Sequence, residues 1–257
     1  MYRTLKTSVA IMLIAFLAGA YASAAPDLGL APEQKARMKD LMQSTRQQTQ
    51  TLRQTLDDRR HQLMRVYGEY SLKTDKARSL NRDINDFQLR LLNANLDSQL
   101  GIRGILNREQ FTQFNELVRR PRGRHGPGEM LEDEKGMPFG PKEFGPLSMS
   151  QPQKENMKRL WRKSRERPNA AIEAIKTKSA DLETLYHNYD LDGAKARAAI
   201  RDLNTAQKQL LDARLRLQVE MRHSLTEDQF NRLRDAMEQR MKNWRMQRGE
   251  PHHGLER

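Results

Sequence analysis

The sequence repeats itself with a fixed offset, and this constrains the fold more than any other feature. When the 257-residue chain is shifted by 119 positions, residues 30–118 align with residues 149–237 without a gap. Roughly 26 of the 89 aligned positions are identical. A fixed period of this kind indicates one structural unit used twice. Any fold proposed for the first copy must therefore also suit the second copy.

Each copy has the apolar spacing of long helices. From Met38 to Tyr70, steps of three and four residues alternate along one apolar seam with a few polar interruptions. A second stripe runs from Leu80 to Leu100, and a third helix is expected from Asn107. No segment has the alternating pattern of a strand. The sequence therefore predicts an all-α fold.

The second copy carries one residue that opposes this pattern. Pro168 lies inside the segment that matches the first long helix. Proline removes a backbone hydrogen bond and clashes with the preceding turn. We therefore expect a kink or break near Arg167, followed by a helix that runs to about Tyr189.

A short phrase occurs in both copies, as LNREQF at 106–111 and LTEDQF at 225–230. An Asn or Thr followed three residues later by Gln predicts a capping box, and the flanking Leu and Phe predict a hydrophobic staple. Each phrase is therefore expected to begin a helix. The caps, their Gln partners and the staple residues are Asn107, Thr226, Gln110, Gln229, Leu106, Phe111, Leu225 and Phe230.

The remaining segments divide the chain. Residues 1–24 have a basic start, an apolar stretch and the small residues of a cleavage site near Ala24, which predicts a signal peptide and export to the periplasm. Residues 120–146 are rich in Pro and Gly and predict a flexible linker, and residues 248–257 predict a disordered tail. The two helical modules are then residues 25–119 and residues 147–247.

The charge of the chain points to acidic partners. Its formal net charge is +13, and it contains no cysteine. For an exported protein this charge favours acidic proteins, unfolded chains or anionic lipid headgroups over nucleic acid. Arginines on the long helices are the candidate partner-binding residues: Arg53, Arg59, Arg60, Arg65, Arg162 and Arg165.

The sequence predicts neither an enzyme nor a cofactor. It has no nucleophile elbow, no phosphate-binding glycine loop and no grouping of Ser, His and Asp. Its six histidines include no pair spaced by four on a predicted helix, so we expect no tight metal site. The pair His252 and His253 in the tail is a candidate for weak binding of a transition metal.

An exported helical module with Leu-x-Pro-Glu-Gln near its start and Leu-Thr-x-x-Gln-Phe near its end resembles the periplasmic LTxxQ-motif family. This family includes the Spy and CpxP chaperones and related heavy-metal-resistance proteins. Here the motif stands at Leu106, Asn107 and Gln110, and again at Leu225, Thr226 and Gln229, with weaker forms at 30–34 and 149–153.

The resemblance implies a hairpin-like subunit that dimerises into a curved cradle. It also implies ATP-independent chaperone activity in the envelope stress response, with unfolded envelope proteins or a stress-sensor kinase as partners. The alternative is a heavy-metal-resistance or metal-sensing protein. The His-rich ligand sets of the metal-sensing members are missing here, which favours the chaperone.

Fusion of two modules in one chain suggests that the chain does the work of a dimer. We expect the two Spy/CpxP-like hairpin modules to pack on each other as an intramolecular pseudo-dimer, with the chain monomeric and not inserted in a membrane. A flexible linker of 27 residues would span about 30 Å, which is enough to connect neighbouring modules.

Overall fold

The computed structural model describes residues 28–119 and 147–247. The predicted signal peptide, linker and tail lie outside these residues. The described residues form helices and their connections, without a strand, so the predicted all-α fold is confirmed. The helices are α2 (Pro32–Gly68), α3 (Thr74–Arg103), α4 (Arg108–Arg119), α6 (Gln151–His187), α7 (Gly193–Ser224) and α8 (Glu227–Gln247).

The helices of the two halves begin at matching positions. α2 and α6 begin at residues 32 and 151, α3 and α7 at 74 and 193, and α4 and α8 at 108 and 227. Each of these pairs differs by 119, which is the offset of the sequence repeat. Both halves are therefore an antiparallel pair of long helices followed by a shorter helix.

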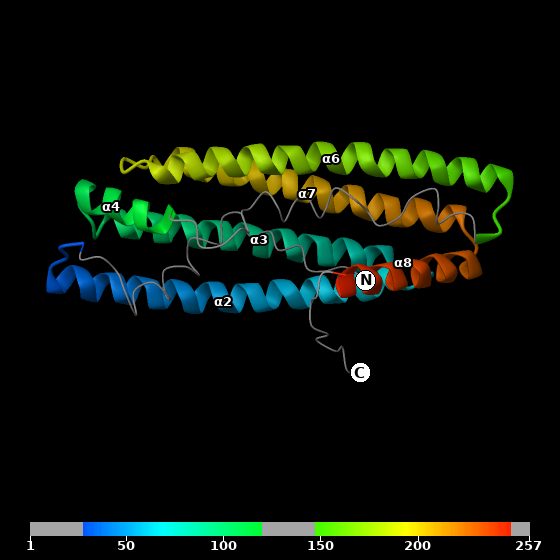
Figure 1. Cartoon of the computed structure of the whole chain (residues 1–257), viewed down its shortest axis with the longest axis horizontal. Helices are drawn as coiled ribbons and strands as arrows, with labels where there is room; N and C mark the ends of the chain where they lie inside the picture. Colours follow the sequence, from blue (N-terminus) through cyan, green and yellow to red (C-terminus); the bar gives the residue numbers. More distant parts are fainter. Residues whose placement is uncertain (1–27, 120–146, 248–257) are drawn as a thin grey trace.

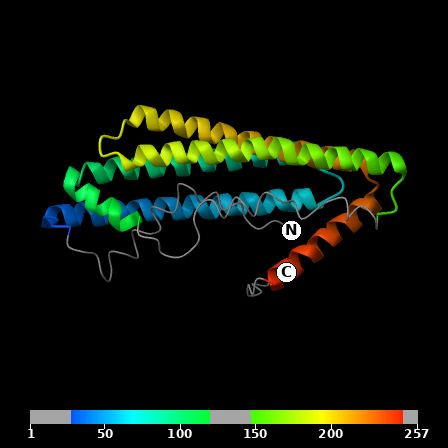
Figure 2. The same ribbon diagram turned by 45° about the horizontal axis from the view of Figure 1, so that its top comes forward.

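The four long helices lie side by side in one row, in the order α2, α3, α7 and α6 (Figure 1). Only neighbours in this row pack closely along their lengths, so α2 and α6 form its two outer edges. With 37 residues each, these edge helices are about 55 Å long. The short helices α4 and α8 lie at opposite ends of the row (Figure 2). The protein is thus thin in one direction and broad in the other two.

The predicted seam of α2 faces the interior. Met38, Leu52, Leu56 and Leu63 are all buried on this helix. Thr49 interrupts the seam, and its hydroxyl donates to the Thr45 carbonyl at 2.7 Å. This bond satisfies a buried polar group within the helix itself, so the interruption does not break the seam.

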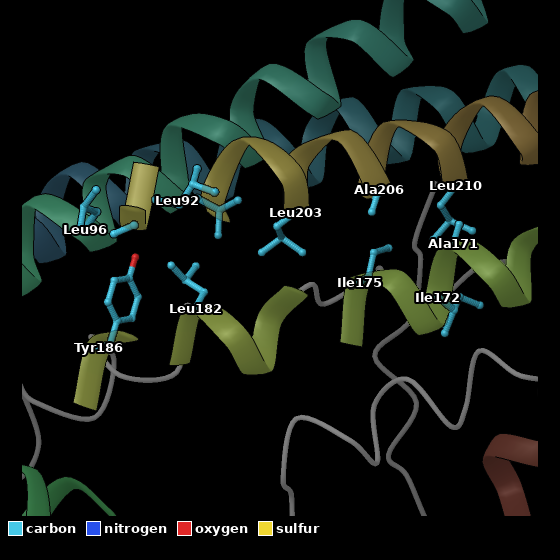
Figure 3. Close-up of a cluster of buried hydrophobic side chains, with 12 residues drawn as sticks. Leu92, Leu96, Ala171, Ile172, Ile175, Leu182, Tyr186, Leu203, Ala206 and Leu210 are labelled. Atoms are coloured by element: carbon cyan, nitrogen blue, oxygen red, sulfur yellow. The ribbon is translucent and has the colours of Figure 1, made fainter. Parts of the chain in front are cut away.

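The core continues across the middle of the row. Leu92 and Leu96 of α3 pack with residues of α6 and α7, including Ile175, Leu182 and Leu203 (Figure 3). In the same way, Leu211 and Leu215 of α7 join the cluster between α2 and α3. Burial of apolar side chains at about 25 cal/mol per Å² is the main source of stability in such a fold. The two halves therefore share their core.

The predicted break near Arg167 is wrong, because α6 runs without interruption from Gln151 to His187 and has Pro168 inside it. The helix ends at His187, close to the predicted end at about Tyr189. Buried residues on both sides of the proline, Leu160 and Ile172, each belong to a core cluster. Packing of both flanking segments holds them in one helix, which offsets the local cost of the proline.

Candidate functional site

Both repeated phrases form the predicted capping boxes. The Gln110 backbone N–H donates to Asn107 Oδ1 at 2.9 Å, and the Asn107 N–H donates to Gln110 Oε1 at 3.1 Å. At the other end, the Gln229 N–H donates to Thr226 Oγ1 at 3.3 Å, and the Thr226 N–H donates to Gln229 Oε1 at 3.0 Å. These bonds pair backbone groups that a helix start leaves without a partner.

The two glutamines also bind residues far away in the sequence. Gln34, at the start of α2, donates to Gln110 Oε1 at 3.0 Å and to the Ile105 carbonyl at 2.7 Å. The equivalent Gln153 donates to Gln229 Oε1 at 3.0 Å and to the Ser224 carbonyl at 3.2 Å. Each Gln pair therefore fastens the start of a long helix to the start of the following short helix.

A backbone turn completes each Gln pair. Gly29 and Ser148 both adopt positive φ, at 60° and 47°. Their carbonyls accept from the amides of Gln110 at 3.3 Å and of Gln229 at 3.5 Å. Serine is rarely found in this conformation, because its Cβ crowds the backbone. The same turn thus forms in both halves, with and without glycine.

The staple residues lie in the core at each end of the row. Leu106 and Phe111 belong to one buried cluster, and Leu225 and Phe230 belong to another. Each cluster also contains a tyrosine from the opposite half, Tyr189 in the first and Tyr70 in the second. The repeated phrase is therefore part of the contact between the two halves.

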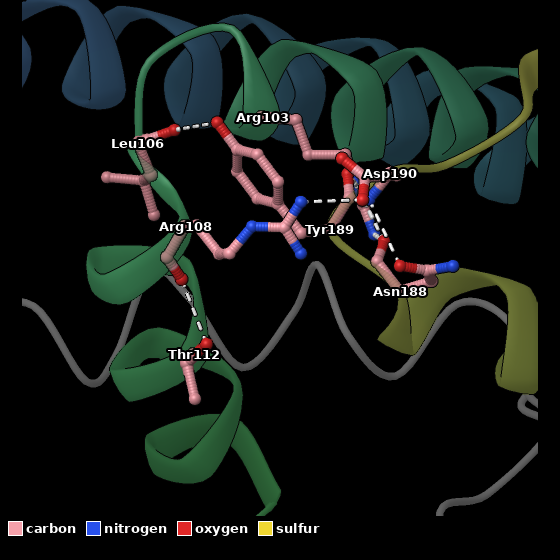
Figure 4. A network of polar contacts seen from close by, with 7 residues as sticks. All are labelled: Arg103, Leu106, Arg108, Thr112, Asn188, Tyr189 and Asp190. Carbon is pink, nitrogen blue, oxygen red and sulfur yellow. Dashed lines mark hydrogen bonds and ion pairs between the residues drawn. The ribbon is translucent and has the colours of Figure 1, made fainter.

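These tyrosines make reciprocal contacts. The Tyr189 hydroxyl donates to the Leu106 carbonyl at 3.2 Å (Figure 4), and the Tyr70 hydroxyl donates to the Leu225 carbonyl at 3.0 Å. The ring of Tyr189 lies 5.5 Å from that of Phe111, and the ring of Tyr70 lies 5.8 Å from that of Phe230. Each pair of contacts is related to the other by the same shift of 119 residues.

We call these two contact regions between the halves, around Tyr189 and around Tyr70, the junctions. The arginine that makes the most hydrogen bonds at each junction was not among the candidates selected from the sequence. Arg222 donates to the carbonyls of Tyr67, Glu69 and Tyr70 at 2.7–3.0 Å. Arg103 makes the matching bonds to the opposite half, to the carbonyls of Tyr186, Asn188 and Tyr189 at 2.6–3.1 Å. These carbonyls lie at the ends of α2 and α6, where helices lack N–H partners. A cation there also opposes the negative end of the helix dipole.

The junction arginines are desolvated and lie against aromatic rings. Burial lowers the pKa of Arg103 to about 10, and burial also raises the pKa of the neighbouring Tyr186 hydroxyl. The Arg103 guanidinium lies 4.3 Å from the centre of the Phe111 ring, and Arg222 lies 4.4 Å from that of Phe230. Arg103 thus stays charged at neutral pH, and each ring favours the cation above it.

The middle of the row contains a third polar contact between the halves. Asn85 of α3 and Asn204 of α7 are equivalent residues, and their side chains hydrogen-bond to each other at 3.1 Å. Asn204 also donates to the Asn85 carbonyl at 2.9 Å. A polar pair in an otherwise apolar helix interface favours one register, because other registers leave its amides unpaired.

The predicted arginine surface is only partly available to a partner. Arg60 is buried and pairs with Asp57, and Arg59 pairs with Asp83 of α3 at 3.4 Å. Arg53 is half-buried, and burial lowers its pKa. Arg65 and Arg162 are exposed, whereas the side chain of Arg165 lies outside the described residues. The structure does not gather the five arginines with described side chains into one site.

Sequence reasoning could have found the junction residues from the repeat itself. Arg103 and Arg222 are identical at the offset of 119, in a stretch where most neighbouring positions differ. Asn85 and Asn204 are also identical, close to the shared Arg82-Asp83 and Arg201-Asp202. Identity between copies that have otherwise diverged was the available signal.

Neither a metal-binding group nor a membrane span is found in the described ranges. Within residues 28–119 and 147–247, no three His, Asp or Glu side chains are grouped so that they could hold a metal ion. No helix of that part of the chain is both long and apolar enough to cross a bilayer.

One family model, described as LTXXQ motif family protein, matches residues 17–118. The matched range contains Leu106, Asn107 and Gln110, while the literal Leu-Thr-x-x-Gln at 225–229 lies outside it. No curated protein and no solved structure matches the chain.

Proposed function

Residues 17–118 belong to the LTXXQ motif family, and from this premise we propose that the protein is an ATP-independent chaperone of the periplasm. It would bind unfolded or acidic envelope proteins. The family is typically periplasmic, which agrees with the predicted signal peptide.

The observation that supports this function most is the single row of long helices. Because α2 packs along its length against α3, and α7 reaches it only through a few side chains such as Leu211, Leu215 and Arg222, no second layer of described long helices covers the row. A row of this kind offers broad surfaces for its mass, which suits partners without a fixed shape. Exposed basic side chains such as Arg65 and Arg162 would attract acidic segments. Half-buried apolar side chains such as Phe87 and Leu89 would add short-range contact.

Suppression of aggregation tests the proposal. The mature chain, without ATP, is mixed with a chemically unfolded model protein, and light scattering is followed with time. We expect scattering to fall as the chain approaches equimolar amounts. R65Q/R162Q should weaken the effect, whereas K195Q/R197Q, with the same net charge and equally exposed sites, should weaken it less. Full aggregation at several-fold excess of the wild type would refute the proposal.

The same assay addresses the metal-resistance alternative. It is run with and without a chelator, on protein whose metal content has been measured. A chaperone of the proposed kind works equally well in both conditions. Activity that disappears with the chelator and returns with one added metal would favour the metal-dependent alternative instead.

We also expect the proposed chaperone to be a monomer whose halves pair within one chain. The reciprocal bonds of Arg103 and Arg222 support this, since each half donates hydrogen bonds to helix-end carbonyls of the other half. A tether of 27 residues gives an effective concentration near the millimolar range, so even a weak interface would close. Sedimentation should report one species of monomer mass. After cleavage at a protease site inserted near Gly136, the halves should remain associated, and their free separation would contradict intramolecular pairing.

A further inference from the structure

The first half of α6 carries a dense group of exposed cations. Lys158, Arg159, Arg162 and Lys163 lie within six residues, and all four side chains are exposed. Arg159 donates to Asn156 Oδ1 at 2.6 Å. None of the four forms an ion pair with a described side chain. These four residues are the basic face of α6.

Farther along the same helix, basic residues are neutralised by neighbours. Lys176 pairs with Glu173 at 3.1 Å, and Lys178 pairs with Asp202 of α7 at 3.7 Å. The unpaired positive charge is therefore local to the first half of α6 and does not extend along the whole helix.

The other half of the chain shows that the fold does not require this charge. The residues of α2 equivalent to the basic face are Lys39, Asp40, Gln43 and Ser44, and all four are exposed. Their formal charges sum to zero, whereas those of the basic face sum to +4. Since both helices occupy outer edges of the row, packing explains neither set.

The position of the basic face indicates the shape of its partner. α6 packs mainly against α7, with further contacts to α3 and α8, so its opposite side is an outer edge of the row. Trp161 lies in the same stretch, half-buried against the cluster at that end. Cations spaced along the exposed side of a long helix match a flat surface of many anions better than a single acidic ligand, which needs converging groups. Trp side chains favour the boundary between water and lipid.

We propose that the basic face of α6 docks peripherally on a bilayer, by contact with the phosphates of anionic phospholipids. This goes beyond chaperone activity and does not depend on it. Each Lys or Arg near an anionic leaflet contributes roughly fivefold to binding, and the attraction falls within a Debye length. Four cations together would give reversible binding that is sensitive to salt, without insertion.

Vesicle co-sedimentation with the mature full chain tests the proposal. The probes are vesicles of phosphatidylcholine alone and vesicles that also contain phosphatidylglycerol. R159D/R162Q/K163S gives α6 the residues that α2 has at the equivalent positions, and it lowers the net charge by four units. The control K76Q/R82Q/R201Q/R216Q also removes four units, from exposed sites on α3 and α7. Far-UV circular dichroism establishes that both variants remain folded.

We expect the wild type to bind only the vesicles with phosphatidylglycerol. R159D/R162Q/K163S should bind about 100-fold more weakly at low salt, while the control loses much less. The reciprocal variant D40R/Q43R/S44K, which gives α2 the residues of α6, should bind more tightly than the wild type. Equal losses in the triple variant and in the control would overturn the proposal, because net charge alone would then explain binding.

A second arm replaces vesicles with succinylated casein, an acidic protein without lipid. Weaker casein binding by the triple variant, with vesicle binding unchanged, would assign the basic face to a protein partner and overturn the proposal. Aggregation suppression is measured on the same variants. If the wild type suppresses aggregation but binds no vesicles, membrane docking fails and the chaperone function stands. If it binds vesicles without suppressing aggregation, the chaperone function fails and membrane docking stands.

Discussion

The two ends of the helix row use the same residues but bury them to different depths. Arg222 is only 8% exposed, whereas its equivalent Arg103 is half-buried. The Arg103 end has an additional ion pair, Arg108 to Asp190 at 2.6 Å (Figure 4). The equivalent positions at the other end are Glu227 and Ser71, which cannot form that pair. The arginine and tyrosine contacts that join the halves are thus the same at both ends, while the surface residues around them differ.

This difference separates what the fold needs from what it tolerates. Equivalent residues that contact the opposite half, such as Tyr70 and Tyr189, are identical in the two copies. Equivalent residues on the outer edges, such as Asp40 and Arg159, have opposite charge. We infer that the junctions limit divergence and that the edges are where the halves are free to acquire different partners.

The largest expected difference between the halves concerns proline. Thr49 and Pro168 are equivalent, and Thr49 is 2% exposed. Thr49→Pro should lower the free energy of unfolding by about 3 kcal/mol or more, because it removes a hydrogen bond inside α2. Pro168→Ala should raise it by about 1–3 kcal/mol, because α6 is already continuous. Urea unfolding followed by circular dichroism measures both.

Ala170→Ser, an exposed change two residues from Pro168, is the control and should have little effect. A loss of stability in Pro168→Ala would contradict the view that packing merely offsets the cost of the proline in α6. It would mean that the proline sets a bend on which the packing of α6 depends.

The junction arginines should differ in the same assay. Arg222→Ala should cost about 3 kcal/mol, because the buried carbonyl of Tyr67 and the partly buried carbonyl of Glu69 lose a charged donor. Arg103→Ala should cost about 1–2 kcal/mol, since water can reach more of that site. Arg222→Lys keeps the charge but loses the planar fork, so it should recover only part of the loss. Equal costs for the two alanine variants would show that burial does not distinguish the ends.

The helix caps should respond alike in the two halves. Asn107→Ala and Thr226→Ala should each cost about 1 kcal/mol, the usual scale for the loss of a side-chain cap. The exposed first-turn residues Glu109→Ala and Glu227→Ala provide comparisons at the same helix starts. Unchanged melting temperatures in both cap variants would mean that the repeated phrase is retained for a reason other than capping.

Much of this architecture follows from the sequence. The offset of 119 predicts that the halves share one order of helices, and the phrases at 106–111 and 225–230 predict where α4 and α8 begin. These signals are local, since they depend on residues a few positions apart. They are therefore visible without knowledge of the tertiary fold.

The features that sequence reasoning missed depend on contacts between distant segments. Arg222 reaches carbonyls more than 150 positions away, and spacing within a helix gives no sign of such a bond. The break predicted near Pro168 is wrong for the same reason, because the packing that keeps α6 continuous comes from distant residues of α3, α7 and α8. The candidate arginines were selected for density in the sequence, which does not show that Arg60 is buried.

The smallest expected difference lies at the turns before α2 and α6. Gly29 and Ser148 both have positive φ, and each carbonyl accepts from the motif glutamine of its own half. A Cβ at Gly29 would meet no atom within 4 Å. Gly29→Ala therefore measures only the cost of holding a non-glycine residue at positive φ, and it should lower the free energy of unfolding by about 1 kcal/mol. Ser148→Gly relieves the strain but gains freedom in the unfolded chain, so it should stabilise by only about 0.5 kcal/mol. Thermal unfolding of both variants, with Ser71→Gly at an exposed turn residue of ordinary φ as a reference for glycine itself, separates the two effects. If Ser148→Gly destabilises as much as Ser71→Gly does, the turn at Ser148 is not strained, and the two halves begin in different ways despite their matching hydrogen bonds.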